Sequence, residues 1–293
     1  MGVKRAFIFP GQGSQLTGMG ANLYEQEPGI RHLFDQADDI LGYSLKQLMF
    51  HGEERDLKRT EVTQPAVFVY SYATFLSRES GIPDAVAGHS LGELTALVVS
   101  KALDYESGLR LVAARATAMQ AACELTSSTM AAILGLDDQV IQQVCNDTPG
   151  IVVAANYNCP GQVVISGETA AVEMAMENCK KAGAKRAIQL AVGGAFHSPL
   201  MTPARDMFAE AIDRTVFHTP VCPVYRNVDA DPSVNPDTIR HKLLHQLTSS
   251  VQWTHTIERM KEDGISEYME FGSKVLGGFV KKIDKDALVT SVE

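Results

Sequence analysis

The sequence predicts an α/β protein in which a smaller subdomain is inserted into a large core built around a parallel sheet. Three observations predict it. Short apolar segments at residues 5–9 and 84–88 each lead into a glycine-rich turn, with helical patterns between and after them. Residues 127–193 instead show the order strand, helix, strand, strand, helix, strand. The α/β pattern resumes with a helix near residue 198.

The first half of the chain supplies the first two strands. Residues 5–9 form a short apolar segment that ends at Pro10. Helical patterns follow to about Ser80, among them "QPAVFVYSYATFLSRES", which is apolar enough for a core. After Pro83 comes the strand at 84–88. Helices are then predicted for "LGELTALVVS" and from Tyr105 to about Glu124.

The middle of the chain has its own pattern. Strands are predicted for "STMAAILGL", "GIVVAA", "GQVVISG" and "AKRAIQLAV", and helices for "DDQVIQQVCN" and "TAAVEMAMENCKKAG". This βαββαβ order is that of ferredoxin-like domains and can close a small sheet. We therefore expect residues 127–193 to form a small subdomain, and residues 1–126 and 194–293 the large one. The next helix opens at "SPLM", where Ser198 suits the N-cap and Pro199 the first helical position.

Composition excludes several classes of protein. Apolar residues make up 45% and charged residues 21% of the 293 positions, as in ordinary globular proteins. No apolar run is long enough for a membrane span, and "MGVKRAFIFPGQG" is too short in apolar residues for a secretory signal. The net charge of −9 argues against general nucleic-acid binding. We expect a cytoplasmic protein without membrane or nucleic-acid partners.

The five cysteines are widely spaced and form no C-x-x-C pair. They are Cys123, Cys145, Cys159, Cys179 and Cys222. This spacing indicates neither a zinc site nor a disulfide framework. Reduced, structural cysteines and no metal are expected.

The segment from Gly88 to Gly92, "GHSLG", matches the pattern G-x-S-x-G. Because it stands between a predicted strand and a predicted helix, it fits the nucleophile elbow of an α/β-hydrolase-like core, with Ser90 as the nucleophile. The helix that starts near Leu91 directs free N–H groups toward the site, where negative charge develops on an attacked carbonyl. The alternative is a chance match in an ordinary glycine-rich turn.

A serine hydroxyl needs a base, and the best-placed histidine is His197 in "VGGAFHSPLM". It lies in a turn just before a helix, after two glycines. His241 and His245 share a helix face but lack the glutamate of H-E-x-x-H, so a surface pair is favoured over a zinc site. His89 adjoins the nucleophile and is expected to point away from it. The remaining histidines lie among polar residues: His32, His51, His218 and His255.

Arg115 lies on an apolar part of the helix "GLRLVAARATAMQ". Its neighbours three and four positions away are Leu111, Val112, Ala118 and Met119. An arginine in such surroundings is costly unless its guanidinium meets an anion. A structural salt bridge or a side chain that reaches the solvent explains the pattern as well as a receptor for a substrate carboxylate does.

A second glycine-rich turn, "FPGQGSQ", follows the first strand. Leu16 stands where the third glycine of G-x-G-x-x-G would be, and the lysine of a P-loop is missing. A nucleotide site is therefore not indicated. Such a turn can instead offer a backbone N–H, such as that of Gln12, to an oxyanion.

Taken together, these motifs resemble the malonyl-CoA:acyl-carrier-protein transacylase family, which includes the acyltransferase domains of polyketide synthases. The motifs occur in the family's order from about residue 5 to residue 283: "FPGQGSQ", "TQPAVF", "GHSLGE", "RATAMQ", "GAFHSPLM", "NVDA", "QLTSSVQWT" and "EFGSKVLGGFVKK". One departure is that Gly272-Ser273-Lys274 has a single serine where the family usually has Pro-Gly.

The resemblance implies a role for each matching residue. Ser90 would be the nucleophile, His197 its base, and Arg115 the group that binds the malonyl carboxylate. The N–H groups of Gln12 and Leu91 would form the oxyanion hole. The backbone carbonyl of Gln246 would orient the histidine, so no triad aspartate is needed. Further pocket residues would be Gln64, Asn158 and Phe196, the last crowding substituents on the malonyl α-carbon.

The activity that the resemblance implies is transfer of malonyl from malonyl-CoA, through a malonyl-serine intermediate, to the phosphopantetheine thiol of acyl carrier protein. This reaction serves fatty-acid or polyketide synthesis and needs no cofactor. Two alternatives remain open from the residues alone. A serine esterase or thioesterase would use the same elbow but has no use for Arg115. A non-catalytic acyl-binding module would not need the intact pair Ser90 and His197.

Overall fold

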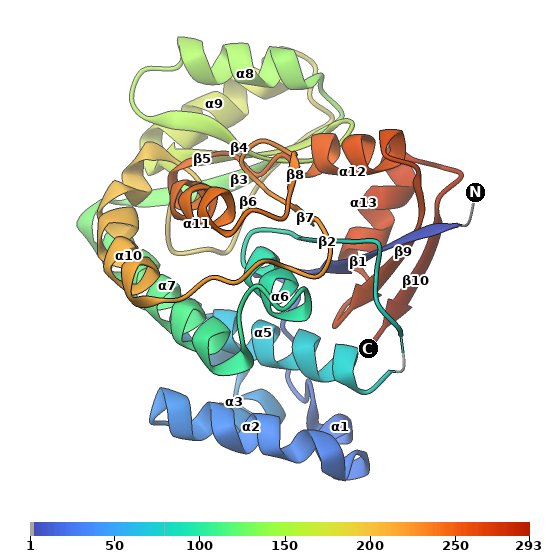
Figure 1. The fold of residues 1–293 in the computed structure, drawn as a ribbon. Coiled ribbons are helices and arrows are strands. Elements are labelled where there is room, and N and C mark those ends of the chain that lie inside the picture. Colours follow the sequence, from blue (N-terminus) through green and yellow to red (C-terminus); the bar gives the residue numbers. More distant parts are fainter. Residues whose placement is uncertain (1–2, 79) are drawn as a thin grey trace.

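The computed structural model describes residues 3–78 and 80–293, which form two β-sheets surrounded by helices (Figure 1). The larger sheet has the strand order β10-β9-β1-β2-β7-β8 and the smaller one the order β4-β5-β3-β6. The predicted α/β fold, with a parallel core sheet and a separate small sheet, is confirmed. Met1, Gly2 and Glu79, which fall in predicted segments, lie outside the described residues.

The large sheet is parallel except at one edge. Its parallel strands are β1 (Lys4–Phe9), β2 (Ala85–Gly88), β7 (Val224–Tyr225), β9 (Ile265–Phe271) and β10 (Leu288–Val292). The two-residue β8 (Pro232–Ser233) pairs antiparallel with β7. The two strands predicted for the large core, β1 and β2, are neighbours at the centre of the sheet. The turns that follow them therefore meet at one end of it.

Helices cover both faces of the large sheet (Figure 1). One face carries α5 (Thr60–Leu76), α6 (Gly92–Val99) and α7 (Tyr105–Leu125), and the other α12 (Trp253–Glu262) and α13 (Val275–Ile283). In β1, Phe7 and Phe9 pack in the apolar cluster on the face covered by α5, α6 and α7. Ala6 and Ile8 pack in the cluster on the face covered by α12 and α13. Both sets are fully buried. A strand covered on both faces has no exposed side, which explains the continuous apolar segment.

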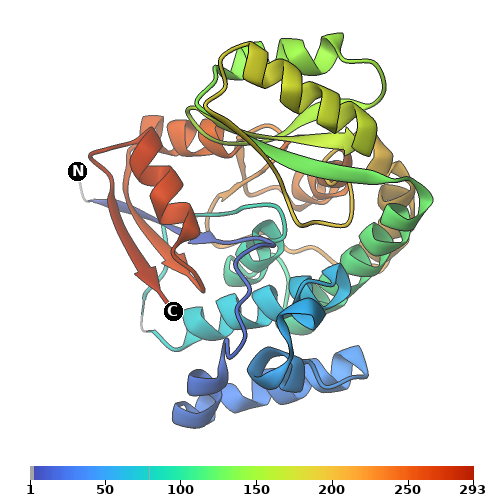
Figure 2. The ribbon, with the colours of Figure 1, turned by 180° about the vertical axis from the view of Figure 1, so that it is seen from behind.

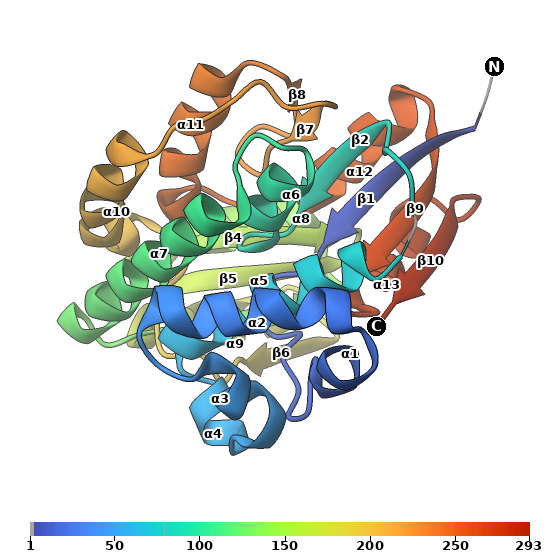
Figure 3. The ribbon, with the colours of Figure 1, turned by 60° about the horizontal axis from the view of Figure 1, so that its bottom comes forward.

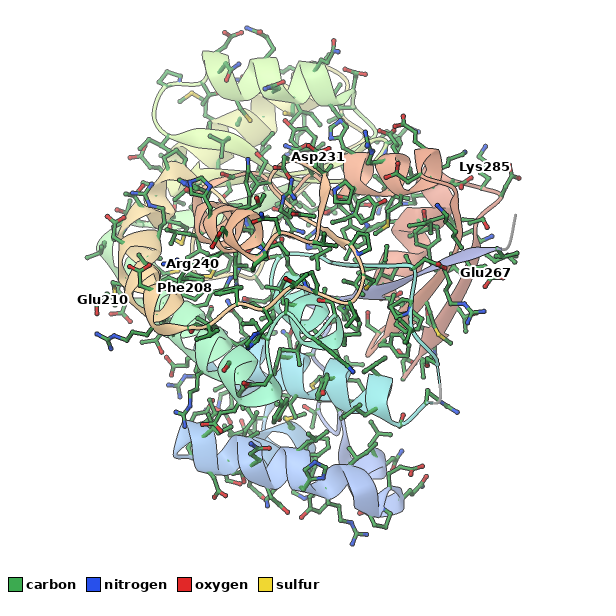
Figure 4. The ribbon with its side chains drawn as sticks, viewed as in Figure 1. Phe208, Glu210, Asp231, Arg240, Glu267 and Lys285 are labelled. Carbon is green, nitrogen blue, oxygen red and sulfur yellow. The ribbon has the colours of Figure 1, made fainter. Side chains whose placement is uncertain are left out.

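The remaining helices surround this core. At one end lie α1 (Ala21–Gln26), α2 (Pro28–Leu41), α3 (Leu45–His51) and α4 (Glu54–Leu57), and α2 packs beside α5 (Figure 3). Helix α10 (Thr202–Arg214) packs against α7 and against α11 (Pro236–His245). Helix α10 is amphipathic: Phe208 is buried, whereas Glu210 extends outward (Figure 4).

The small sheet is antiparallel and consists of β3 (Ser128–Leu134), β4 (Val152–Cys159), β5 (Gln162–Glu168) and β6 (Arg186–Gln189). Helices α8 (Asp138–Asp147) and α9 (Thr169–Lys181) cover its outer face (Figure 2). They share a separate apolar cluster with the sheet. The strand order and connections are those of a ferredoxin-like unit.

Several element boundaries differ from the prediction. Strand β6 was expected over residues 184–192 but pairs only over residues 186–189. The chain leaves the sheet after Leu190, whose N–H still donates to the Met130 carbonyl. Residues beyond it line a cleft instead. The helix predicted to end near Ser80 ends at Leu76. Ser198 is the expected N-cap, but the first turn is a 3₁₀ helix over Pro199–Met201.

The small sheet is tied to the large core beside that cleft. Val251 forms a parallel bridge with Asn156 of β4. Its N–H donates to the Ala155 carbonyl at 2.8 Å, and its carbonyl accepts the N–H of Tyr157 at 2.9 Å. These backbone bonds fix β4 relative to the segment that carries Gln246.

The short turn at Gly272-Ser273-Lys274 is accommodated by the carboxylate of Glu270. This buried side chain accepts a hydrogen bond from Ser273 Oγ. It also accepts the N–H groups of Val275, Leu276 and Gly277 at 2.8–3.0 Å, which caps α13. A carboxylate at a helix N-terminus is favourable, so the departure from the family pattern leaves α13 well anchored.

Three further findings concern the cysteines, metal binding and membrane-spanning helices. All five cysteines are free thiols, and four of them are buried. Within residues 3–78 and 80–293, no cluster of three or more His, Cys, Asp or Glu side chains is arranged to hold a metal ion. Over the same residues no helix is both long and apolar enough to cross a membrane.

Candidate active site

Ser90 lies on a tight turn between β2 and α6, with a φ of 54°. The glycines on either side are required by close packing. A Cβ on Gly88 would lie 1.8 Å from the carbonyl carbon of Gly92, and one on Gly92 would lie 2.1 Å from the Phe9 carbonyl oxygen. Left-handed backbone at a serine costs about 1–3 kcal/mol, which the surroundings must supply. The elbow predicted from "GHSLG" is present.

Two side chains hold Ser90 in this conformation. Its N–H donates to Asn227 Oδ1 at 2.6 Å, and its carbonyl accepts Gln246 Nε2 at 3.0 Å. Asn227 Nδ2 also donates to the Gly88 carbonyl at 2.6 Å. Because both backbone groups of the serine are bonded, its Oγ is directed into the cleft.

Ser90 Oγ and His197 Nε2 are 2.7 Å apart. On the other side of the ring, His197 Nδ1 lies 2.9 Å from the backbone carbonyl of Gln246. A carbonyl only accepts, so Nδ1 carries the hydrogen and the lone pair of Nε2 faces the serine hydroxyl. Burial, reinforced by the nearby Arg115 guanidinium, lowers the pKa of His197 to about 3. The imidazole is therefore neutral at neutral pH and able to take the serine proton.

His197 is held as firmly as the serine. It has a φ of 59°, and only 3% of its surface is exposed. Ser166 Oγ of β5 donates to the Phe196 carbonyl at 2.7 Å, and Ser198 Oγ donates to the Ala195 carbonyl at 2.7 Å. The loop that follows the small sheet thus places His197 beside Ser90, which lies at the end of β2.

Two backbone N–H groups beside the serine are available to a ligand. Among the described residues, the N–H groups of Leu91 and Gln12 have no hydrogen-bond acceptor. Leu91 stands at the N-terminus of α6, where the helix dipole favours negative charge. Gln12 follows β1, the strand next to β2. Both groups are therefore free to stabilise an oxyanion.

Arg115 is buried, with 1% of its surface exposed, and all its partners are neutral. It donates to Gln64 Oε1 at 2.8 Å, to Gln246 Oε1 at 2.9 Å and to Ser90 Oγ at 3.0 Å. Within the described part of the chain it has no carboxylate within 4.0 Å, and its Nε has no acceptor. Burial lowers its pKa to about 10, so it stays charged at neutral pH.

The two structural explanations of Arg115 are therefore wrong: it forms no salt bridge in the described chain and does not reach the solvent. Glu93, the nearby carboxyl group, favours the charged form of Arg115 but does not contact it. A buried guanidinium that contacts no carboxylate among the described residues, beside a serine hydroxyl, is a preformed site for an anion.

The cleft between the two sheets has a volume of about 220 Å³. Its apolar lining includes Met119, Met130, Val164, Leu190, Phe196, Leu276 and Phe279. Asn158 also lines it and accepts a hydrogen bond from His89 Nε2 at 2.8 Å. His89 itself lines the same cleft, but its ring bonds Asn158 and not Ser90. Seven of the nine predicted site residues line this cleft: Gln12, Gln64, Ser90, Arg115, Asn158, Phe196 and His197.

The other two predicted residues lie beneath the cleft. Gln246 is fully buried and acts through its backbone carbonyl and its amide, and Leu91 is fully buried and presents its N–H. His241 and His245 lie elsewhere, on the exposed face of α11, with their Nε2 atoms 3.2 Å apart. They form the surface pair that the sequence favoured.

Three residues of the site were given no role from the sequence: Glu93, Asn156 and Asn227. Glu93 is fully buried, and its Oε2 accepts Gln246 Nε2 and the Asn227 N–H, each at 2.9 Å. Burial raises the pKa of Glu93 to about 7, against the effect of these two hydrogen bonds. Asn156 of β4 lines the cleft and has an Oδ1 without a donor among the described residues. Glu93 had a usable signal, because it is a lone charge in the apolar helix "LGELTALVV".

Comparison with known proteins agrees with this site. Residues 6–271 match the acyl transferase domain family. A malonyl CoA-acyl carrier protein transacylase of Bacillus subtilis is 43% identical over 96% of this chain and 91% of its own length. The Escherichia coli K12 protein of the same name is 42% identical over 95% of this chain and 92% of its own length.

Solved structures of similar proteins superpose closely. A malonyl-transacylase in complex with its type II PKS acyl-carrier protein is 40% identical, with a TM-score of 0.95 over 99% of this chain and 96% of that one. The malonyl CoA-acyl carrier protein transacylase of Coxiella burnetii is 38% identical, with a TM-score of 0.96 over 100% of this chain and 94% of that one. The chain, with its serine elbow and its facing histidine, therefore belongs to the acyl transferase domain family.

Proposed function

We propose that this protein transfers a malonyl group from malonyl-CoA to the phosphopantetheine thiol of an acyl carrier protein, through an ester on Ser90. The observation that carries this proposal is the buried Arg115, a cation that contacts no carboxylate among the described residues and whose guanidinium contacts Ser90 Oγ. A simple acetyl donor would leave that charge unpaired. A malonyl donor brings the carboxylate that the site lacks.

In the first half of the reaction, His197 Nε2 takes the proton of Ser90 Oγ as the oxygen attacks the thioester carbonyl. The carbonyl oxygen becomes an oxyanion, which the N–H groups of Gln12 and Leu91 stabilise. When the intermediate collapses, the carbon–sulfur bond breaks. The protonated His197 returns its proton to the CoA sulfur, so CoA leaves as a thiol and malonyl-serine remains.

In the second half, the thiol of the carrier's arm gives its proton to His197 and its sulfur attacks the ester carbonyl. The carbon–oxygen bond of the ester breaks, and His197 returns the proton to Ser90 Oγ. The enzyme is restored and the carrier holds the malonyl thioester. Arg115 fixes the carboxylate throughout, which keeps the carbonyl in the oxyanion hole and leaves water a poor approach.

Two other features support the proposal. The two relatives and the two solved structures named above are transacylases or malonyl-transacylases by name, and one is bound to an acyl carrier protein. The mechanism uses only side chains and backbone groups of this chain.

The separate apolar cluster of the small sheet supports residues 127–193 as a subdomain inserted between residues 1–126 and 194–293. Either fatty-acid or polyketide synthesis, in the cytoplasm, would use this activity.

The test is a panel of malonyl-, acetyl- and butyryl-CoA, with mass spectrometry of the intact protein and of the peptide that contains Ser90. A malonyl adduct should form fastest, lie on Ser90, and disappear when a carrier protein with its phosphopantetheine arm is added. Ser90→Ala is the matched control. An adduct that water removes as fast as the carrier does would indicate an esterase, and no adduct from any donor would indicate a binding module.

A further inference from the structure

Glu93 is a buried carboxyl group that the reaction steps above do not use. It lies in the first turn of α6, three residues after Ser90, and is fully buried. Its Oε2 accepts the Gln246 amide and the Asn227 N–H, whereas its Oε1 has no donor within the described residues. A carboxyl group is costly to bury, so its role should follow from the two groups that it contacts.

Gln246 contacts Ser90, His197 and Arg115. Its backbone carbonyl accepts His197 Nδ1, its Oε1 accepts Arg115, and its Nε2 donates to the Ser90 carbonyl. A side-chain amide can be turned either way, since its oxygen and nitrogen have similar shapes. The reversed orientation would set an NH₂ group against the guanidinium. The Glu93 oxygen and the Ser90 carbonyl, both acceptors, keep the NH₂ group on their side.

Asn227 forms the other half of the same network. Its side chain holds the Ser90 N–H and the Gly88 carbonyl, each at 2.6 Å, and its own N–H donates to Glu93. One oxygen of Glu93 therefore bonds both residues that hold the nucleophile. It contacts neither Ser90 Oγ nor the ring of His197.

We propose that Glu93 is a positioning residue, which sets the orientation of the Gln246 amide and so holds the Arg115 guanidinium where the donor's carboxylate binds. This inference rests on the function proposed above, because it assigns the selectivity for a carboxylated acyl group to a side chain that never touches it. Partial loss of this network should therefore harm malonyl transfer more than acetyl transfer.

Glu93 supplies a hydrogen-bond acceptor in both its neutral and its charged form. Its raised pKa, about 7, means that the group is partly protonated at neutral pH. A proton on the unpartnered Oε1 leaves Oε2 able to accept both bonds. Glutamine at this position keeps an acceptor, and methionine, of the same chain length, removes it. This pair of variants separates the acceptor from packing.

The experiment measures second-order rate constants for acylation of Ser90 by malonyl-CoA and by acetyl-CoA, using mass spectrometry. It compares the wild type, Glu93→Gln and Glu93→Met, each also in an Arg115→Ala background. Glu93→Met should lower the malonyl-to-acetyl ratio about tenfold, and Glu93→Gln should keep it within about threefold. With Arg115 removed, Glu93→Met should not change the ratio, because the coupling runs through the guanidinium.

Glu270→Gln is the matched control. Glu270 is equally buried and accepts several hydrogen bonds, but it contacts none of Ser90, His197 and Arg115. This variant should lose thermal stability without a change in the ratio. The proposal is overturned if Glu93→Met keeps the wild-type ratio, if Glu93→Gln loses as much as Glu93→Met, or if Glu93→Met still lowers the ratio without Arg115. A wild type that forms no malonyl adduct contradicts the proposed function itself.

Discussion

The two sheets face each other across one cleft but contribute different chemistry to it. The large sheet and its helices provide the nucleophile Ser90, the cation Arg115 and the carboxyl group Glu93, linked by hydrogen bonds. The small sheet provides neutral side chains: the apolar Met130 and Val164, and the amides of Asn156 and Asn158. His197 stands on the loop that joins them.

This difference suggests a division of labour. Charge develops and protons move only where the large core has built a fixed polar network, since such groups stabilise a transition state only when preorganised. The small sheet forms a wall that can contact the long arms of the donor and the carrier without entering the chemistry. Changes in the core should then alter acylation itself, and changes in the small sheet should alter the encounter with the partner.

The largest effect is expected from the reacting pair. Ser90→Ala removes the nucleophile and should abolish the acyl-enzyme for every donor. His197→Ala should slow acylation by about three or more orders of magnitude, because the serine then has no base. The measurement is adduct formation by mass spectrometry. A malonyl adduct that persists elsewhere in Ser90→Ala would contradict this assignment of the chemistry to the core.

Arg115→Ala should come next. It removes a two-point contact with the donor's carboxylate and should cost about 2–4 kcal/mol in kcat/KM for malonyl-CoA. Acetyl transfer should be unchanged or faster, because the variant lacks an unpaired buried cation. Equal losses with both donors would make Arg115 a structural residue and would remove the main support for a malonyl donor.

The reacting residues were predictable because each carries a local signal. Ser90 has glycines on both sides between a strand and a helix, and Arg115 is a charge among apolar neighbours. Glu93 has the same kind of signal as Arg115, and the argument used for one applies to the other. A single charged residue in an otherwise apolar helical segment is thus a sign, visible in the sequence, of a buried polar network.

The contacts of other site residues had no local signal. Asn227 begins the quoted motif "NVDA", but its bond to Ser90 across 137 positions of the chain follows from the pairing of β2 with β7. Asn156 lines the cleft because the bridge to Val251 sets β4 beside it. Such contacts depend on tertiary packing, which no spacing of residues along the chain encodes. The strand β6 was predicted but too long, for the same reason, since residues after Leu190 line the cleft and pair with no strand of the described chain.

A pH experiment can sharpen the comparison between the sheets. The pKa of His197 falls from 6.5 to about 3 on folding, so between these values only the unfolded chain binds the proton. Its contribution to stability is complete above pH 6.5 and is lost as the pH falls toward 3. Between pH 7 and pH 5, this should cost the wild type about 2 kcal/mol relative to His197→Gln.

The measurement is urea unfolding of both proteins at the two pH values. Glu93 titrates in the opposite sense, since its raised pKa favours the folded state at low pH, but it is present in both proteins and cancels. Asn156→Ala in the small sheet is the control and should follow the wild type at both pH values. A stability difference between the wild type and His197→Gln that does not change with pH would mean that the buried imidazole is not neutral.

The smallest effect is expected at the edge of the small sheet, where the carrier protein should approach. Lys181 at the end of α9 and Lys185 before β6 are exposed and form no ion pair within the described residues. They lie just before Leu190, which lines the cleft. Carrier proteins are acidic, and this chain has a net charge of −9, so attraction requires a local basic surface.

Reversal of either charge to glutamate should raise KM for the carrier roughly two- to fivefold at low salt, because exposed charges act mainly on association. Added salt should remove the difference. The rate of Ser90 malonylation should not change, since neither Lys181 nor Lys185 lines the cleft. Lys285→Glu, an exposed lysine beside β10 (Figure 4), is the matched control and should leave the carrier's KM unchanged. If the control behaves like the other two variants, net charge rather than a docking surface controls the encounter.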